Sequence, residues 1–260
     1  MKNNDSIFTL LSCIFFFCNC CSAENVIIDQ IDSYEKVESD EKKDNMKAIV
    51  IGATGAVGRD LIQQLHSDEN FESVEIFARR NIYLDHPKFH VHVINFDHPD
   101  EWKDKVRGDV LFSCLGTTIK QAGSEENQWK IDHDYQLEFA KAAHANEVKK
   151  YILVSSIGAD ANSKIFYLKM KGALEDNVKK LGLPSIIILQ PPGLIRKNSD
   201  RLGEKLLIAL LNFANSLGLF KDQKPMPTEK VASAMVDLAK AESSEKSMTV
   251  SGQEILDYGE

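Results

Sequence analysis

Cysteine is almost absent from most of this 260-residue sequence. Four of the five cysteines lie within the first 21 residues, and only Cys114 lies beyond residue 45. A disulfide framework is therefore excluded for the larger part, whose composition is typical of a reducing compartment. A basic excess is lacking too, because 31 Lys and Arg stand against 39 Asp and Glu, a net charge of −8. This balance argues against nucleic acid as a partner.

Internal repeats and long apolar runs are also missing. No solenoid-type or collagen-like period occurs, and no low-complexity tract is found beyond residue 45. The composition, 43% hydrophobic and 27% charged, is that of a globular protein with one domain or at most two. The apolar run Ile7 to Phe17 is too short to span a bilayer comfortably.

The first 45 residues differ from the rest. Residues 1–23 resemble a signal or anchor segment with a small-residue cleavage site after Ala23, and residues 24–45 carry eight acids and three lysines, as a solvated linker does. Met46 then directly precedes a strand pattern. Three interpretations stay open: a signal or anchor, a chain that starts at Met46, or another targeting segment. We expect a cytoplasmic protein if the chain starts at Met46, and otherwise a signal-directed one, with membrane contact only through residues 1–23.

Residues 46–260 alternate short apolar runs with helical patterns, which predicts βαβ units. Several runs are apolar without alternation, as in strands covered on both faces. We therefore expect an α/β fold, a doubly wound, mainly parallel Rossmann sheet of about seven strands with helices on both faces. The predicted strands are 47–52, 73–78, 90–95, 109–114, 150–155, 184–190 and 247–251. The predicted helices are 55–66, 126–146, 166–181, 203–218 and 229–240.

A glycine-rich loop follows the first predicted strand. Gly52, Gly55 and Gly58 stand three apart and open a helix. In this arrangement the first glycine permits a tight turn, the second lets the backbone approach a pyrophosphate, and the third lets the helix pack close to the strand. The free N–H groups at the helix N-terminus then bind the diphosphate. The loop predicts dinucleotide binding; a glycine turn that serves packing alone is the alternative.

The end of the second strand indicates which dinucleotide. An NAD-binding Rossmann protein places an acid there against the ribose 2′-hydroxyl, whereas this chain has Arg79 and Arg80. Guanidinium groups hold a 2′-phosphate, so we predict NADP(H) in preference to NAD(H). Asp97, after the third strand, stands where such folds contact adenine. His90 and His92 share a strand face without further ligands at matching spacing, so no metal site is expected.

A tyrosine and a lysine lie four residues apart at the start of a predicted helix. Tyr167 and Lys171 therefore share one helix face, and the lysine ammonium favours the ionised form of a nearby tyrosine. Ser155 closes the strand twelve residues before Tyr167, and Ser156 follows it. A hydroxyl at this strand end is suited to hydrogen-bond a substrate carbonyl oxygen.

These motifs resemble the short-chain dehydrogenase/reductase superfamily in its atypical or extended branch. More narrowly, Cys114–Thr118, Ser155–Asp160 and the Tyr167-x-x-x-Lys171-Gly172 pattern are similar to the Tat-interacting-protein oxidoreductase family and its bacterial relatives, over about residues 46–240. The resemblance implies that Ser155, Tyr167 and Lys171 are catalytic. It also implies a cofactor site made of Gly52, Thr54, Gly55, Ala56, Val57, Gly58, Arg79, Arg80, Asp97, Leu115, Gly116 and Lys171.

The sequence departs from these families at two places. Asp132 stands where the extended branch has an asparagine that supports the lysine through water, and Gln190-Pro191-Pro192-Gly193 replaces an Arg-Pro-Gly sequence. The substrate region, about residues 191–225, has no recognisable signature. A polar stretch within it (Arg196, Lys197, Asn198 and Arg201) is suited either to an acidic substrate or to a solvated loop.

The sequence therefore favours an NADPH-dependent oxidoreductase that reduces a small carbonyl substrate, with Tyr167 as proton donor. Two alternatives remain. One is an NADPH-binding regulatory or assembly protein with little turnover, because fold does not determine function. The other is an epimerase or dehydratase with tightly held NAD, which fits Tyr167 and Lys171 but not Arg79 and Arg80. The sequence makes no prediction of oligomeric state.

Overall fold

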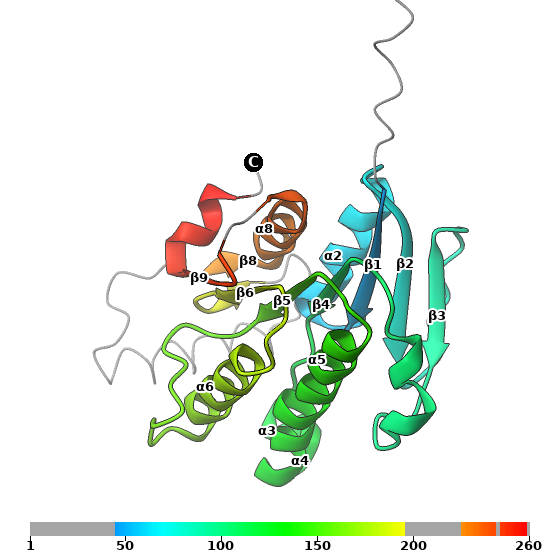
Figure 1. Cartoon of the computed structure of the whole chain (residues 1–260). Coiled ribbons are helices and arrows are strands. Elements are labelled where there is room, and N and C mark those ends of the chain that lie inside the picture. Colours follow the sequence, from blue (N-terminus) through cyan, green and yellow to red (C-terminus); the bar gives the residue numbers. More distant parts are fainter. Residues whose placement is uncertain (1–44, 196–224, 243–244, 259–260) are drawn as a thin grey trace, which may run out of the picture. The chain divides into compact units, whose positions relative to one another are not determined.

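The computed structural model describes residues 45–195, 225–242 and 245–258. Seven parallel strands form one sheet in the order β3-β2-β1-β4-β5-β6-β9 (Figure 1). This confirms the predicted Rossmann-like α/β fold, and each predicted strand is present within two residues. The strands are β1 (Met46–Ile51), β2 (Phe71–Ala78), β3 (Phe89–Val93), β4 (Val110–Ser113), β5 (Lys150–Val154), β6 (Ser185–Gln190) and β9 (Ser247–Ser251).

The helices agree with the prediction except at two places. The helix expected over 126–146 is interrupted by a π-helical turn, η3 (Lys130–Asp134), and the helix expected over 203–218 lies outside the described residues. The α-helices are α2 (Ala56–Ser67), α3 (Ile119–Ala122), α4 (Glu125–Trp129), α5 (Tyr135–Ala145), α6 (Phe166–Lys179) and α8 (Thr228–Lys240). The short elements are η1 (Pro99–Glu101), η2 (Lys103–Lys105), η4 (Gly252–Asp257) and the paired strands β7 (Leu194–Ile195) and β8 (Met226–Pro227).

The sheet separates two hydrophobic cores. Side chains alternate between its faces, so Ala48 and Val50 pack in the core that includes α2 and α8, while Ile49 and Ile51 pack in the core that includes α5 and α6. Figure 1 shows these helix pairs on opposite sides of the sheet. The strands are buried on both faces, which explains their unbroken apolar runs.

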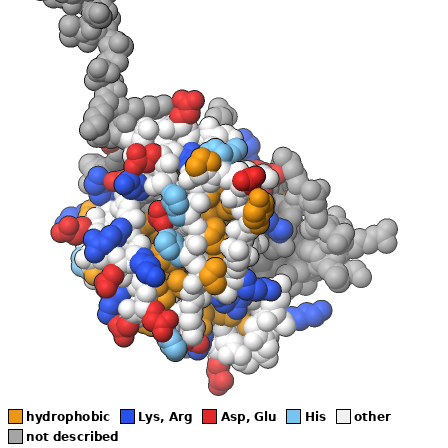
Figure 2. All heavy atoms as spheres, turned by 90° about the vertical axis from the view of Figure 1, so that its right-hand side faces the viewer, with side chains coloured by type: hydrophobic (Ala, Val, Ile, Leu, Met, Phe, Trp, Pro, Cys, Tyr) orange, Lys and Arg blue, Asp and Glu red, His pale blue; other side chains and the backbone are white. Residues whose placement is uncertain are grey.

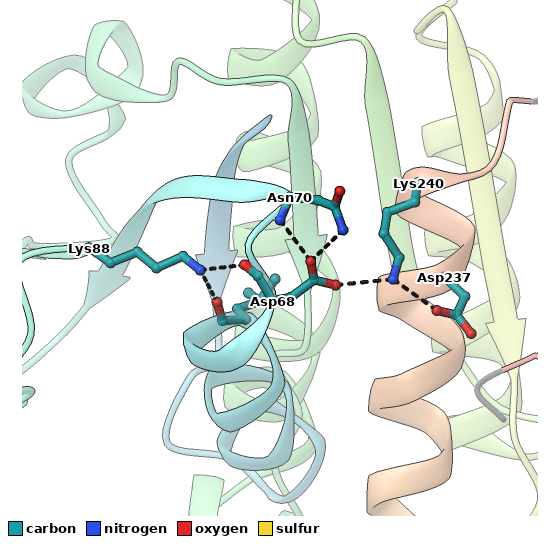
Figure 3. Close-up of polar contacts among 6 residues, drawn as sticks. Asp68, Asn70, Lys88, Asp237 and Lys240 are labelled. Atoms are coloured by element: carbon teal, nitrogen blue, oxygen red, sulfur yellow. Dashed lines mark hydrogen bonds and ion pairs between the residues drawn. The ribbon is translucent and has the colours of Figure 1, made fainter. Parts of the chain in front are cut away.

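A polar cluster fastens the end of α2 to its neighbours (Figure 3). The Lys88 ammonium donates to the carbonyl oxygens of Leu65 and Asp68, the latter at 2.6 Å. The Asp68 carboxylate accepts from the Asn70 N–H at 2.9 Å and pairs with the Lys240 ammonium at 3.0 Å. A cation is favourable here, because the carbonyl groups at a helix C-terminus lack partners within the helix. Lys88 and Lys240 thus connect α2 with β3 and α8.

The strand order reverses beside β1. From β1 the chain moves outward through β2 and β3, and it then returns to the other side of β1 to continue through β4, β5, β6 and β9. In open α/β sheets a ligand binds at the carboxyl ends of the strands where the order reverses. Here that point lies between β1 and β4.

The surface near β3 carries mixed charge. On this face basic and acidic side chains are interspersed with histidines and small hydrophobic areas, so it has no field of one sign (Figure 2). Among the described residues, no helix has the length and apolarity needed to cross a membrane.

Candidate cofactor and catalytic site

The glycine loop lies at the reversal point. Gly52 follows β1 with a φ of +83°, and a Cβ atom there would lie 2.4 Å from the carbonyl carbon of Cys114, just after β4. A Cβ atom on Gly58 would lie 2.1 Å from the Gly52 carbonyl oxygen. A side chain at either position would therefore displace backbone. The glycines let β1, α2 and the end of β4 meet closely, as the sequence predicts for the first and third glycine.

The N-terminus of α2 suits a diphosphate. Gly55 is its N-cap residue and provides no side-chain hydrogen bond, and the first turn contains no acidic residue. The first N–H groups of a helix have no partner within the helix and attract anions. Thr54 is exposed, and Ala56 and Val57 begin the helix, so the predicted loop residues surround this terminus.

Arg79 and Arg80 directly follow β2, the strand that pairs with β1. Both side chains are exposed. Because the two strands are parallel, their carboxyl ends lie at the same edge of the sheet. Arg79 and Arg80 therefore lie at the same edge of the sheet as the glycine loop, at the strand end where a Rossmann protein binds the adenosine ribose.

Asp97 is already paired within the protein. Its Oδ1 accepts a 2.6 Å hydrogen bond from the Tyr135 hydroxyl and lies 2.7 Å from the Lys130 ammonium. The hydrogen bonds from Lys130 and Tyr135 hold the pKa of this exposed carboxyl below its ordinary value. Asp97 therefore connects the segment after β3 to η3 and α5. Its position in the sequence did not indicate these two partners.

The loop after β4 is held by a buried carboxyl group. Leu115 and Gly116 follow the strand, and the next residue, Thr117, donates its N–H to Asp132 Oδ1 at 2.8 Å. Asp132 lies on the π-helical turn and is 1% exposed. Burial raises its pKa, although the nearby Lys171 charge acts in the opposite direction. Asp132 thus fixes the end of the Leu115–Gly116 segment, which the family resemblance assigns to the cofactor site.

Tyr167 and Lys171 lie on the first two turns of α6. Lys171 is 3% exposed, and its ammonium donates to the carbonyl oxygen of Val154 at 3.4 Å, at the end of β5. An ammonium has three hydrogens. Within the described residues this long contact is its single hydrogen bond, so a buried charge keeps unused donors. Tyr167 is half-buried, and no hydrogen bond joins its hydroxyl to another described residue.

Ser155 belongs to a buried polar network that sequence reasoning missed. Its hydroxyl donates to Oε1 of Glu175, which is 5% exposed. The Gln190 amide nitrogen donates to both Glu175 oxygens, at 2.9 and 3.0 Å, and the Ser251 hydroxyl donates to the Gln190 amide oxygen at 2.7 Å. The network joins the ends of β5, β6 and β9 to α6. A signal was available, since Glu175 continues the four-residue spacing of Tyr167 and Lys171.

Gly172 brings the loop after β5 against α6. A Cβ atom on this residue would lie 2.2 Å from the Ala161 nitrogen, and the Asp160 N–H donates to the Leu168 carbonyl oxygen at 3.1 Å. Gly172, the residue after Lys171, is therefore needed for the close packing of this loop against α6. After β6, Pro191 and Pro192 are buried, and the Pro191 carbonyl oxygen accepts from the Ile157 N–H at 3.1 Å, so the loops after β5 and β6 are joined.

Together the fold, the glycine loop and the strand-end residues define an NAD(P)-binding Rossmann domain. A family model described as NAD(P)H-binding matches residues 52–242. The mitochondrial protein FMP52 of Candida albicans is 32% identical over 81% of this chain and 97% of its own length. The mitochondrial protein FMP52-1 of Scheffersomyces stipitis is 36% identical, over 77% and 91%. The chain belongs to the NAD(P)H-binding family, together with the FMP52 proteins.

Solved structures support the fold. ADP-L-glycero-D-manno-heptose-6-epimerase of Helicobacter pylori superposes with a TM-score of 0.60 at 17% identity, covering 82% of this chain and 78% of that chain. At this identity the likeness concerns the fold alone. It agrees with the Rossmann fold that the sequence predicts.

Proposed function

We propose that this protein is an NADPH-dependent oxidoreductase that reduces a carbonyl group. The observation that carries the proposal is the buried Lys171 ammonium, which has a single hydrogen bond among the described residues. It lies one helical turn from the Tyr167 hydroxyl, which has no hydrogen-bond partner among them. A buried charge that is only partly satisfied is costly to the folded state and is typical of functional sites. A ribose hydroxyl group is a suitable acceptor for the remaining donors.

Different residues of the chain would donate the proton, stabilise the resulting charge and orient the substrate. When bound, NADPH supplies a hydride to the carbonyl carbon. Tyr167 donates its hydroxyl proton to the oxygen, and the Lys171 charge stabilises the phenolate that remains. A serine hydroxyl at the end of β5 orients the oxygen. The Thr117–Asp132 hydrogen bond keeps the Leu115–Gly116 segment in position beside the reacting groups.

The arginines support a preference for NADPH. Arg79 and Arg80 are exposed at the end of β2, where a carboxylate would repel a 2′-phosphate. Guanidinium groups bind phosphate through paired charge-assisted hydrogen bonds. Gly55 and the uncapped start of α2 would hold the diphosphate.

An NADPH-binding regulator with little turnover is the competing function. To separate the two, purified full-length protein is first shown to bind NADPH and then given NADPH with aldehydes, ketones and quinones. Oxidation of NADPH is followed by the loss of absorbance. Saturable turnover with at least one carbonyl class supports the enzyme. Tight NADPH binding without turnover across the panel would favour the regulator.

We further propose a mitochondrial location, because the FMP52 relatives are named as mitochondrial proteins. The first 45 residues, with four bases and nine acids, lack the basic composition of a mitochondrial transit peptide. Fractionation of cells that express the full chain with a C-terminal tag tests the proposal. Recovery with mitochondria is expected, and recovery in the cytosolic fraction would contradict it. The N-terminal mass of the recovered protein identifies which targeting interpretation holds.

A further inference from the structure

Two consecutive serines at the end of β5 have different surroundings. Ser155 is buried and donates to Glu175, whereas Ser156 is half-buried and its hydroxyl makes a 3.3 Å contact with the carbonyl oxygen of Ile157. We propose that the hydroxyl which donates to the substrate carbonyl oxygen belongs to Ser156, while Ser155 is a structural residue held by Glu175. This inference rests on the proposed carbonyl reduction and assigns one of its residues.

The hydrogen of the Ser155 hydroxyl is already used in a hydrogen bond to Glu175. A serine hydroxyl has a single hydrogen, so Ser155 cannot donate to Glu175 and to a substrate at once. Glu175 acts as an acceptor, because the Gln190 amide nitrogen also donates to it and the Lys179 ammonium lies 3.8 Å from Oε2. The Gln190 amide is itself oriented, since the Ser251 hydroxyl donates to its oxygen at 2.7 Å and leaves the nitrogen to face Glu175.

Glu175, which holds Ser155, lies far along α6 from Tyr167. Glu175 lies eight residues after Tyr167, and at 1.5 Å per residue this is a rise of about 12 Å. Through its bond to Glu175, Ser155 is anchored two helical turns from the proton donor. A substrate oxygen that accepts from Tyr167 needs its second donor much closer.

The segment after Ser155 runs toward Tyr167. It begins at Ser156 and reaches Asp160, whose N–H donates to the carbonyl oxygen of Leu168, the residue after Tyr167. The Ile157 N–H donates to the Pro191 carbonyl oxygen at 3.1 Å, which fixes the start of this segment. Ser156 thus belongs to the segment that leads from Ser155, which is bonded to Glu175, to Asp160, which is bonded to the residue after Tyr167. Its hydroxyl contact is with a backbone neighbour and is long, so the hydrogen is free to turn to a substrate.

In the proposed step Ser156 keeps its proton. Its O–H donates a hydrogen bond to the carbonyl oxygen, and this bond strengthens as negative charge develops there, while the proton comes from Tyr167. Removal of one such donor typically lowers kcat by about 10²- to 10³-fold. Loss of the Ser155 hydroxyl instead leaves the buried Glu175 carboxylate with one donor fewer and destabilises the fold.

The test compares Ser156→Ala, Ser156→Thr and Ser155→Ala in the full chain, with 9,10-phenanthrenequinone and NADPH as probes. The measurements are kcat, KM, the NADPH dissociation constant and the melting temperature. Ser185→Ala is the matched control, because the Ser185 hydroxyl is buried on β6 and has no hydrogen-bond partner within the described part of the chain. We expect Ser156→Ala to lower kcat/KM by about 10²-fold or more with NADPH binding unchanged, and Ser156→Thr to restore most of it.

We expect Ser155→Ala to lower the melting temperature while its kcat/KM stays close to that of the wild type. The inference is overturned if Ser155→Ala abolishes turnover while retaining NADPH binding, or if Ser156→Ala is as active as the control. In both cases carbonyl reduction itself stands. If the wild-type protein binds NADPH but turns over neither the quinone nor the wider carbonyl panel, the proposed function fails, and the assignment of Ser156 fails with it.

Discussion

A methyl group on Gly52 would lie 2.4 Å from the carbonyl carbon of Cys114, so the loop after β1 and the end of β4 are in contact through backbone alone. Gly52 also has a φ of +83°, which is unfavourable for any residue with a side chain. We predict that Gly52→Ala lowers the free energy of unfolding by at least about 2 kcal/mol, because it adds backbone strain and overlap.

Urea denaturation measures this effect. Gly116→Ala is the matched control, since no described residue other than its two chain neighbours has an atom within 4 Å of the position of its Cβ atom. The Gly52→Ala protein should unfold at a clearly lower urea concentration than the Gly116→Ala protein. Equal midpoints would show that the close contact between Gly52 and Cys114 does not constrain the loop.

Much of the fold could be predicted from the sequence, because strands that are buried on both faces consist of consecutive apolar residues. Ile186 to Leu189 is such a run, and it forms the interior of β6. The glycine loop was also predictable, because the spacing of its three glycines is a local feature of the sequence. The π-helical turn was not, because the periodicity of residues 126–146 is that of one continuous helix.

The partners of the site residues were harder to predict. Asp97 pairs with Lys130 and Tyr135, which lie more than 30 residues away in the sequence. Ser155 meets Glu175 only because α6 packs beside β5. Contacts of this kind depend on tertiary packing, whereas the sequence indicates only that a hydroxyl stands at a strand end.

In the proposed function, the preference for NADPH over NADH depends on Arg79. We predict that Arg79→Gln weakens NADPH binding by about tenfold to a hundredfold, the range expected for a lost charge-assisted hydrogen bond. NADH binding should be nearly unchanged, because that cofactor has no 2′-phosphate. Titration calorimetry gives both dissociation constants. Arg107→Gln removes the same charge just before β4, far along that strand from its carboxyl end, and should alter neither constant.

An equal loss of NADPH and NADH affinity in Arg79→Gln would contradict this account. It would indicate that the arginine contributes to the loop's structure rather than to recognition of the 2′-phosphate.

Burial raises the pKa of Asp132, which gives stability a pH dependence of known sign. Above the ordinary carboxyl value of 3.8, the unfolded chain ionises this group more readily than the folded protein does, so the folded state loses stability as the pH rises. Asp132→Asn keeps an acceptor for the Thr117 N–H and removes the charge. We therefore predict a variant that gains stability relative to the wild type at neutral pH.

The gain should shrink as the pH falls and vanish below 3.8, where the wild-type carboxyl group is protonated in both states. Denaturant titrations of both proteins at several pH values give the difference in unfolding free energy. A difference that is independent of pH would mean that Asp132 does not titrate as its burial requires.

The cation at the end of α2 should contribute to stability. Lys88→Met removes the bonds to the Leu65 and Asp68 carbonyl oxygens shown in Figure 3. We predict a loss of about 1.5–3 kcal/mol in the free energy of unfolding, the range for hydrogen bonds to a charged group. The control Lys120→Met, at an exposed position on α3, should change it by less than about 0.5 kcal/mol. Similar losses in both variants would show that the helix end does not need this partner.

The central claim is that Tyr167 delivers the proton in carbonyl reduction, and Tyr167→Phe tests it most directly. The change removes one oxygen atom from a half-buried side chain whose hydroxyl has no partner among the described residues, so the fold and NADPH binding should be unaffected. With a carbonyl probe that the wild type reduces, we predict that kcat falls by about 10²- to 10⁴-fold while the NADPH dissociation constant stays nearly the same. Wild-type turnover in a Tyr167→Phe protein that binds NADPH normally would contradict the account.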